Sequence, residues 1–353
     1  MRPVSWLVAL LALGVGAFLL WPLIGAEKAA VVLYSSVDQD QFKPVVADFE
    51  RSAGLTVDGV GETEASRSVG MARRLELEKD HPVADVFWAN EIMNTTVLRD
   101  LGVFAPLPQD VLDGFPVRWR DPKGRYVAMA GRARILLVNT KLVPDPKDWP
   151  TSVGDLLDAK WGGDGRRVSV AAPLTGTTYT HAIALLTRDK AAAEAFWTGV
   201  AARGAKGELK IVPGNGAVKQ QVADPANGVA WGLTDTDDAH EAVESGAPVA
   251  VVYPDQAEGG PGTLVIPNTL ALVQGGPHPE DAVRLLRWLA SKETEARLAA
   301  GPIANIPVRD DVPAPAYVKR PGKDFRPMDV DWDAVGANRD RWQSLLQRLF
   351  ASR

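Results

Sequence analysis

Residues 234–238 read Thr-Asp-Thr-Asp-Asp and supply three carboxylates and two hydroxyls within five positions. They follow an apolar segment at 229–233 that has the composition of a strand, and they lead into a predicted helix at 237–245. Carboxylates and hydroxyls at such a junction can cap the first turn of a helix and interact favourably with its dipole. The same oxygen atoms can bind a hard cation such as Fe³⁺ or Ca²⁺, or accept hydrogen bonds from an ammonium group or from sugar hydroxyls. The segment alone fits both a cap and a binding site.

Other predicted strand ends and helix starts are also polar, in ways that helix capping does not require. Ligands of open α/β sheets bind at the carboxyl ends of strands, where loops and helix N-termini converge. An arginine pair, Arg132 and Arg134, alternates at the start of a further apolar strand, so that one of the two is expected to point into a cleft. The polar set comprises Ser35, Ser36, Glu62, Glu64, Asn90, Thr175, Gly176, Thr177 and Thr178. Its recurrence predicts a ligand site between two α/β units.

Motifs of metalloenzymes, nucleotide-binding proteins and hydrolases are absent from the sequence. The four histidines show none of the spacings of zinc sites, and there is neither a Walker loop nor a Gly-x-Ser-x-Gly motif. One acid–base pair is available, His181 with Asp235, and it lacks an identifiable nucleophile. The chain is therefore predicted not to be an enzyme.

Composition excludes several further classes of protein. With 353 residues, 46% hydrophobic and 24% charged, the chain is long enough for two folded domains. A net charge of −5 and the lack of a basic cluster argue against nucleic acid as a partner. The absence of cysteine removes disulfides, thiolate metal sites and thiol nucleophiles.

Residues 1–29 form a separate N-terminal segment. A basic start is followed by 24 residues without charge, which matches a secretory signal except that the small-x-small cleavage site is poor. The same apolar run is long enough to span a bilayer as a helix. The segment is interpreted either as a cleaved signal peptide or as an uncleaved membrane anchor. Both interpretations place the body of the protein outside the cytoplasm.

From residue 30 onward, short β-type runs alternate with helical periodicity, which predicts an α/β fold with a largely parallel sheet. Strands are predicted at 30–36, 55–60, 84–89, 133–139, 167–173, 209–214, 229–233 and 249–255, with a pair of strands in 262–273. Helices are predicted around 42–53, 71–75, 92–101, 177–188, 190–203, 216–223, 237–245, 279–300 and 339–350.

The ordered series VVLYSSVDQDQFKPVVADFE, ADVFWANE, GRARILLVNTKLV and VIPNTLALVQGG resembles extracytoplasmic solute-binding proteins of ABC importers, in the ferric-iron-binding branch. The resemblance covers about residues 30 to 310. It implies a two-lobed type 2 periplasmic binding protein fold with the ligand cleft between the lobes. Lobe 1 is expected to comprise residues 30–133 with 258–309. Lobe 2 is expected to comprise residues 134–257 with 310–353, including a C-terminal helix.

The same resemblance suggests roles for individual residues. Where the iron-binding branch has two adjacent tyrosines as ferric ligands, this chain has Asp237 and Asp238, and no tyrosine pair occurs anywhere in it. A family histidine or acid corresponds to Asp38, and a family glutamate to Glu62 or Glu64. The residues that correspond to the positions of a synergistic anion are Arg132, Thr175, Gly176, Thr177 and Thr178. Asn215 corresponds to a family position that makes a polar contact before the helix. Asp235 and Thr236 are expected to line the cleft beside them.

The sequence thus predicts a monomeric binding protein that captures a small solute by lobe closure and delivers it to an ABC permease. Ferric iron, carried with a synergistic anion, an iron–anion complex or a related small ion is the first hypothesis for the ligand. A non-metal organic solute such as a phosphonate, a polyamine or a sugar is the second. A membrane-anchored sensor on the same scaffold is a third interpretation.

Overall fold

The structure is a computed structural model, and it describes residues 30–37, 39–61, 69–162 and 167–351. Asp38, Glu62 and Glu64 lie outside the described residues, as does the N-terminal segment 1–29. Within the described part, no helix is long and apolar enough to cross a membrane.

Nine strands of the described chain form one mixed sheet in the order β2-β1-β3-β9-β4-β7-β5-β6, with β8 also paired to β4. The strands are β1 (Val31–Ser35), β2 (Val57–Gly61), β3 (Val86–Ala89), β4 (Tyr126–Asn139), β5 (Arg167–Ala171), β6 (Leu209–Val212), β7 (Val229–Asp235), β8 (Val249–Val252) and β9 (Val265–Leu272). The helices are α2 (Gln39–Ala53), α3 (Val69–Leu77), α4 (Ile92–Asp100), α5 (Gln109–Asp113), α6 (Gly176–Arg188), α7 (Lys190–Ala205), α8 (Asn215–Ala223), α9 (Thr236–Glu244), α10 (Pro279–Leu289), α11 (Lys292–Ala300) and α12 (Trp332–Phe350).

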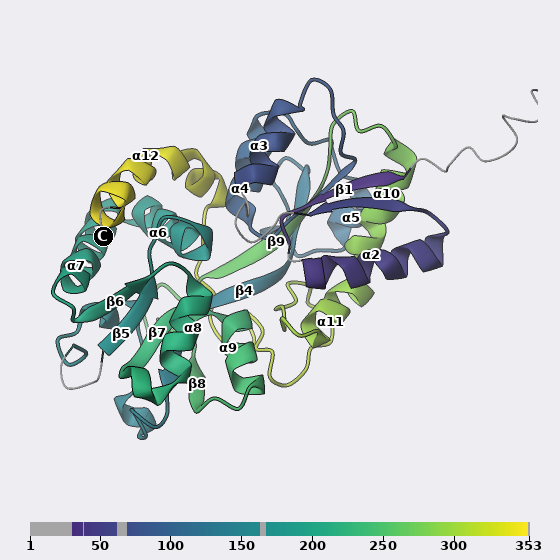
Figure 1. Cartoon of the computed structure of the whole chain (residues 1–353). Helices are drawn as coiled ribbons and strands as arrows, with labels where there is room; N and C mark the ends of the chain where they lie inside the picture. Colours follow the sequence, from purple (N-terminus) through teal and green to yellow (C-terminus); the bar gives the residue numbers. More distant parts are fainter. Residues whose placement is uncertain (1–29, 38, 62–68, 163–166, 352–353) are drawn as a thin grey trace, which may run out of the picture.

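The two lobes are visible in Figure 1 as two groups of helices and strands joined by β4 and β9. Residues 126–133 of β4 pair with β9, whereas residues 134–139 of the same strand pair with β7 and β8. Strands β1, β2 and β3 lie on one side of this junction, and β5, β6 and β7 lie on the other. A single 14-residue strand therefore runs from one lobe into the other. The predicted lobe boundaries near 133 and 258 agree with this pairing but stay a prediction.

A β-bulge interrupts β4 on the lobe 1 side of the junction. The register shifts between Met129 and Gly131, and the intervening Ala130 has a φ of 43°, in the left-handed region. The buried carboxylate of Glu295 on α11 accepts a hydrogen bond from the Ala130 N–H at 2.8 Å and another from the Val308 N–H at 2.9 Å. The unusual backbone of Ala130 is thus fixed by a carboxylate from a distant helix.

Helices cover both faces of the sheet in each lobe, as the alternating pattern predicts. In lobe 1, α2 and α10 pack on one face and α4 on the other; in lobe 2, α8 and α9 pack on one face and α6, α7 and α12 lie on the other (Figure 1). The predicted apolar stripe of α2 is confirmed, since Phe42, Val45, Val46 and Phe49 are all buried.

Two elements differ from the sequence prediction. The single helix expected at 279–300 is wrong: α10 ends at Leu289, and Ser291 caps α11 by accepting a hydrogen bond from the Thr294 N–H at 3.2 Å. A side-chain cap of this kind favours a new helix start over continuation. The pair of strands expected in 262–273 is also wrong, because residues 265–272 form the one uninterrupted strand β9.

The C-terminal helix α12 contacts both lobes, packing on α4 as well as on α6 and α7 (Figure 1). Near its start, the buried Arg99 of α4 forms an ion pair with Asp333 at 2.6 Å. Towards its end, Trp342, Leu346 and Phe350 are buried in the hydrophobic core of lobe 2. The sequence predicts that the tail packs on lobe 2 and leaves contact with a partner open; α12 contacts lobe 1 in addition to lobe 2.

Gly336 allows the close approach of α12 to α4, because a Cβ added there would lie 2.0 Å from Oγ1 of Thr96. We expect Gly336→Val to lower the free energy of unfolding by about 1–3 kcal/mol, the usual cost of overpacking a buried contact. Ala337→Val, at the exposed neighbouring position, is the matched control and should change stability much less. Urea unfolding followed by fluorescence measures both, and equal midpoints for the two variants would contradict the close packing.

Candidate ligand-binding site

The centre of the candidate site is a buried ion pair between neighbouring strands. Antiparallel pairing of β4 with β7 places Arg134 directly opposite Asp235. Nη1 of Arg134 donates to Oδ1 of Asp235 at 2.7 Å, and the two side chains are 0% and 5% exposed. Charges so deeply buried are tolerated only when they are paired and hydrogen-bonded. The pair lies on the lobe 2 side of the strand that joins the lobes.

Three polar side chains add hydrogen bonds to this ion pair, while Nε of Arg134 has no partner among the described residues. Nη2 of Arg134 donates to the Thr178 hydroxyl at 3.0 Å, and the Thr177 hydroxyl donates to Oδ2 of Asp235 at 2.5 Å. The Asn215 amide donates to the same Oδ2 at 2.8 Å and accepts from Nη1 of Arg134 at 3.1 Å. We call Arg134, Thr177, Thr178 and Asn215 the Arg134 cluster. It joins β4 to the starts of α6 and α8.

Arg132, the arginine predicted to hold a synergistic anion, lies outside the Arg134 cluster. Its Nη2 donates to the backbone oxygen of Asn90 at 2.6 Å, and its Nη1 is 3.9 Å from Oδ2 of Asp237. Arg132 thus lies between the end of β3 in lobe 1 and the start of α9 in lobe 2. The buried guanidinium that meets Thr177 and Thr178 belongs to Arg134 instead.

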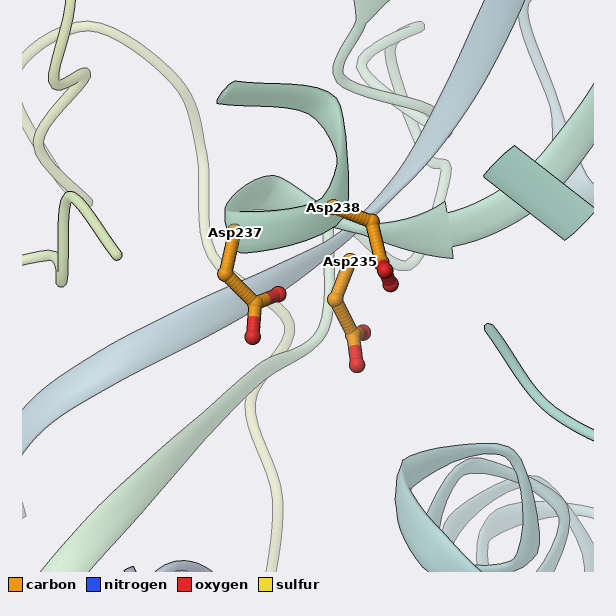
Figure 2. Close-up of side chains that lie close together, drawn as sticks. All are labelled: Asp235, Asp237 and Asp238. Atoms are coloured by element: carbon orange, nitrogen blue, oxygen red, sulfur yellow. The ribbon is translucent and has the colours of Figure 1, made fainter. Parts of the chain in front are cut away.

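Asp237 and Asp238 occupy the first turn of α9, directly after Asp235 at the end of β7. Figure 2 shows the three carboxyl groups projecting to the same side of this turn. One oxygen atom from each lies within 4.8 Å of the other two. Asp238 accepts a hydrogen bond from the Thr234 hydroxyl at 2.7 Å, whereas Oδ1 of Asp237 has no hydrogen-bond partner among the described residues. The arrangement offers oxygen ligands to a hard cation.

The two carboxyl groups of α9 are difficult to ionise where they lie. Burial raises the pKa of Asp237 to about 7, and repulsion from Asp238 and Asp235 adds to this rise, while Arg132 opposes it. Burial likewise raises the pKa of Asp238 to about 6, with repulsion from Asp235 as the next cause. Both groups would gain from a nearby positive charge, because it favours their ionised forms.

The lobe 1 side of the site is formed by residues after β1 and β3. Ser36 and Asn90 are joined by two hydrogen bonds, one from the Asn90 N–H to the Ser36 hydroxyl at 3.0 Å and one from that hydroxyl to the Asn90 side chain at 3.1 Å. Ser35 is fully buried and donates to the backbone oxygen of Trp88, so it supports the strands and does not face a ligand.

The remaining predicted residues flank the Arg134 cluster. Thr175 and Gly176 are exposed at the start of α6, where Gly176 has a φ of 62°. The Thr236 hydroxyl accepts a hydrogen bond from the Ala133 N–H at 3.2 Å, which fixes α9 against β4. The acid–base pair of His181 and Asp235 is not formed: His181 is buried, its pKa is lowered to about 3 by burial, and its ring nitrogens have no hydrogen-bond partner in the described chain.

Sequence reasoning did not single out Glu91. This buried residue caps α4 by accepting from the N–H groups of Met93 and Asn94, and it accepts from the Thr180 hydroxyl of α6 at 2.9 Å. It therefore joins α4 of lobe 1 to α6 of lobe 2 beside the site. The sequence signal for it was weak, since a glutamate after a strand reads as an ordinary surface residue.

A family model described as bacterial extracellular solute-binding protein matches residues 81–327 of the chain. The chain belongs to this family. Among curated relatives of this solute-binding protein, iron uptake protein A1 from Synechocystis sp. is 26% identical over 284 residues, which span 77% of this chain and 74% of the relative.

Solved structures show the same fold at low sequence identity. Iron-bound HitA from Pseudomonas aeruginosa has a TM-score of 0.77 and 21% identity, over 91% of this solute-binding protein and 99% of HitA. The periplasmic binding protein AfuA from Actinobacillus pleuropneumoniae, with exogenous fructose-6-phosphate bound, has a TM-score of 0.74 and 18% identity, over 92% and 99% of the two chains. Because structures of similar fold carry such different ligands, the choice of ligand depends on the side chains of the site.

Replacing Arg134 should destabilise the protein strongly. Arg134→Met leaves Asp235 buried without its counter-charge, and removal of one partner of a buried ion pair typically costs about 3–5 kcal/mol. Arg132→Met, at a partly exposed position two residues earlier, is the matched control and should cost much less. Urea unfolding of the ligand-free proteins tests this, and a similar loss in both variants would contradict the central role of Arg134.

The raised pKa of Asp237 predicts that stability depends on pH. An unfolded aspartate has a pKa of about 3.9, whereas the pKa of Asp237 is about 7 in the folded chain. Between these values the unfolded state releases its proton before the folded state does, so the stabilising contribution present below pH 4 is lost as pH rises to 7.

Asp237→Asn removes this titration. Relative to wild type, the variant should therefore gain stability between pH 4.5 and 7.5 in urea unfolding without ligand. Glu244→Gln, an exposed change on the same helix, is the control and should follow wild type. Parallel curves for wild type and Asp237→Asn would refute the raised pKa.

Proposed function

We propose that this solute-binding protein captures a hard, highly charged cation, ferric iron in the first instance, at Asp237 and Asp238. The observation that carries the proposal is the group of three carboxylates at the end of β7, each with an oxygen atom within 4.8 Å of the others. Asp235 is already neutralised by Arg134 at 2.7 Å. The charge available for a ligand is therefore that of the two aspartates on α9.

The surroundings of Asp237 and Asp238 favour a cation as ligand. Partial burial raises both pKa values, and repulsion from neighbouring aspartates adds to the rise; a bound cation would offset both effects. Nearby positive charge is limited: Arg132 is 3.9 Å from Asp237, and Lys219 is paired with Glu241 at 2.5 Å. Fe³⁺ prefers hard oxygen ligands, and carboxylates supply them. The iron-related relatives described above support this choice of cation.

Lobe closure is the proposed mechanism of capture. The lobes are joined by β4 and β9, and the three aspartates lie beside this junction, so that a bend of the two strands would move lobe 1 towards them. Arg132 is 3.9 Å from Asp237 and donates to the backbone oxygen of Asn90, which is hydrogen-bonded to Ser36. These three residues would complete the closed site. The protein would act as a binder without catalysing a reaction.

Delivery to an ABC permease by a monomeric protein outside the cytoplasm completes the proposal. The family description supports the extracytoplasmic location and the solute-binding role. The N-terminal segment 1–29, as a cleaved signal or a retained anchor, would direct export.

Thermal unfolding of fragment 30–353 with Fe³⁺-citrate tests the proposed ligand. A ligand that binds only the folded protein stabilises it by about 2.7 kcal/mol at a hundred times its dissociation constant. We expect a clear rise in Tm for wild type, and a loss of that rise in Asp237→Ala and Asp238→Ala. Glu244→Gln, which removes an exposed charge from the same helix, should behave as wild type.

Separate titrations with citrate alone, Ca²⁺, spermidine and fructose-6-phosphate distinguish the alternatives. A rise in Tm with citrate alone would assign the effect to the anion. A rise with spermidine but not with iron would make the aspartates acceptors for ammonium groups, and the ferric proposal would be abandoned.

A further inference from the structure

We propose that the Asp235 carboxylate takes the place of an external oxyanion in the Arg134 cluster, so that this protein holds its cation without a co-bound anion. The role of Asp235 as the partner of Arg134 belongs to the ligand-free protein and does not depend on the transported ion. The absence of a co-bound anion rests on the proposed function, and it defines the chemical form in which the cation is carried.

The donors of the Arg134 cluster converge as they do at oxyanion sites. Arg134 presents two N–H groups, and the Thr177 hydroxyl and the Asn215 amide add two further donors. Guanidinium groups combined with hydroxyl and amide donors are the usual partners of carboxylates and phosphates. Thr177 and Thr178 also lie in the first turn of the 13-residue helix α6, where the helix dipole favours a negative charge.

Asp235 already makes the interactions that an oxyanion would make there. Its Oδ1 accepts from Arg134 at 2.7 Å, and its Oδ2 accepts from Thr177 at 2.5 Å and from Asn215 at 2.8 Å. The position is set by the fold, because the β4–β7 register places Asp235 opposite Arg134. The protein thereby supplies both the guanidinium and its counter-ion.

An external anion would have to displace Asp235 to reach these donors. The displaced carboxylate would lose three hydrogen bonds in a position where Asp235 is only 4% exposed. It would also remain beside Asp237 and Asp238, each of which has an oxygen atom within 4.8 Å of one of Asp235, and like charges at this distance repel. Both effects oppose binding of a second anion, whereas neither opposes a cation on the side of α9.

The test removes the Asp235 carboxylate and measures whether an inorganic anion binds to the Arg134 cluster in its place. In metal-free protein, Asp235→Ala leaves Arg134 without its counter-ion. We expect phosphate to raise the Tm of this variant by several degrees, because it restores the lost partner. The Tm of wild type should be unchanged over the same phosphate concentrations.

A charge-matched control separates filling of this position from a general loss of negative charge. Asp237→Ala removes one carboxylate from the same turn but leaves the Arg134–Asp235 pair intact. It should show no phosphate-dependent rise in Tm. An equal response in Asp235→Ala and Asp237→Ala would overturn the inference, and so would a rise in wild type or no response in Asp235→Ala.

A second measurement keeps the inference testable if Asp235→Ala does not fold. Phosphate is titrated calorimetrically into wild type, both metal-free and loaded with Ga³⁺ as a redox-inert substitute for Fe³⁺. We expect no binding heat in either form. One-to-one phosphate binding to the metal-free form would overturn the exclusion of external anions, and binding only to the loaded form would overturn the anion-free cargo.

The two proposals fail in different experiments. If the protein binds no trivalent cation, the proposed function fails, while the metal-free phosphate titrations still decide whether Asp235 replaces an oxyanion. If the cation binds only together with phosphate, the proposed function stands and the present inference fails.

Discussion

The buried ion pair between Arg134 and Asp235 is the interaction on which the rest of the site depends. It joins β4, the strand shared by both lobes, to β7, and its hydrogen bonds extend to α6 and α8. A charge pair at this depth needs further hydrogen bonds to offset the cost of removing both charges from water. The positions of Thr177, Thr178 and Asn215 are therefore consequences of the pair. The orientation of α9 follows as well, because α9 begins directly after Asp235.

Because Arg134 pairs with Asp235, the three aspartates of residues 234–238 have two different roles. Asp235 is used internally, whereas Asp237 and Asp238 remain as carboxyl groups with raised pKa values in the first turn of α9. A sequence of three similar aspartates thus contains one structural counter-ion and two groups available to a ligand. Asp235 occupies the N-cap position of α9 but makes no side-chain cap hydrogen bond, so the helix-cap interpretation does not hold for this residue.

Local periodicity predicted most of the fold, because buried faces must recur at the helix or strand period. The stripe Phe42, Val45, Val46 and Phe49 is an example. Prediction failed where one side chain or a long-range pairing decides the outcome. The Ser291 cap divides α10 from α11, and β9 is continuous because β3 and β4 pair along its length. The antiparallel placement of β9 also depends on such pairing and has no local signal.

For the site, the residue types and the segments could be predicted, but the partners could not. Arg132 and Arg134 have the same local pattern, and only the register against β7 shows that Arg134 meets Asp235. Glu91 could not be found for the same reason, since its partner Thr180 is 89 residues away. The role of Asp38, Glu62 and Glu64 stays a prediction.

The contact of α12 with both lobes has a consequence for the geometry of motion. Two bodies joined only by a pair of adjacent strands can bend about the pair and can also twist along it. The ion pair of Asp333 with Arg99 and the packing of Phe350 in lobe 2 form a third connection, made by a helix distant in sequence from β4 and β9. A movement of the lobes about β4 and β9 must therefore also change the packing of α12, because its first turn contacts lobe 1 and its last turns lie in the core of lobe 2.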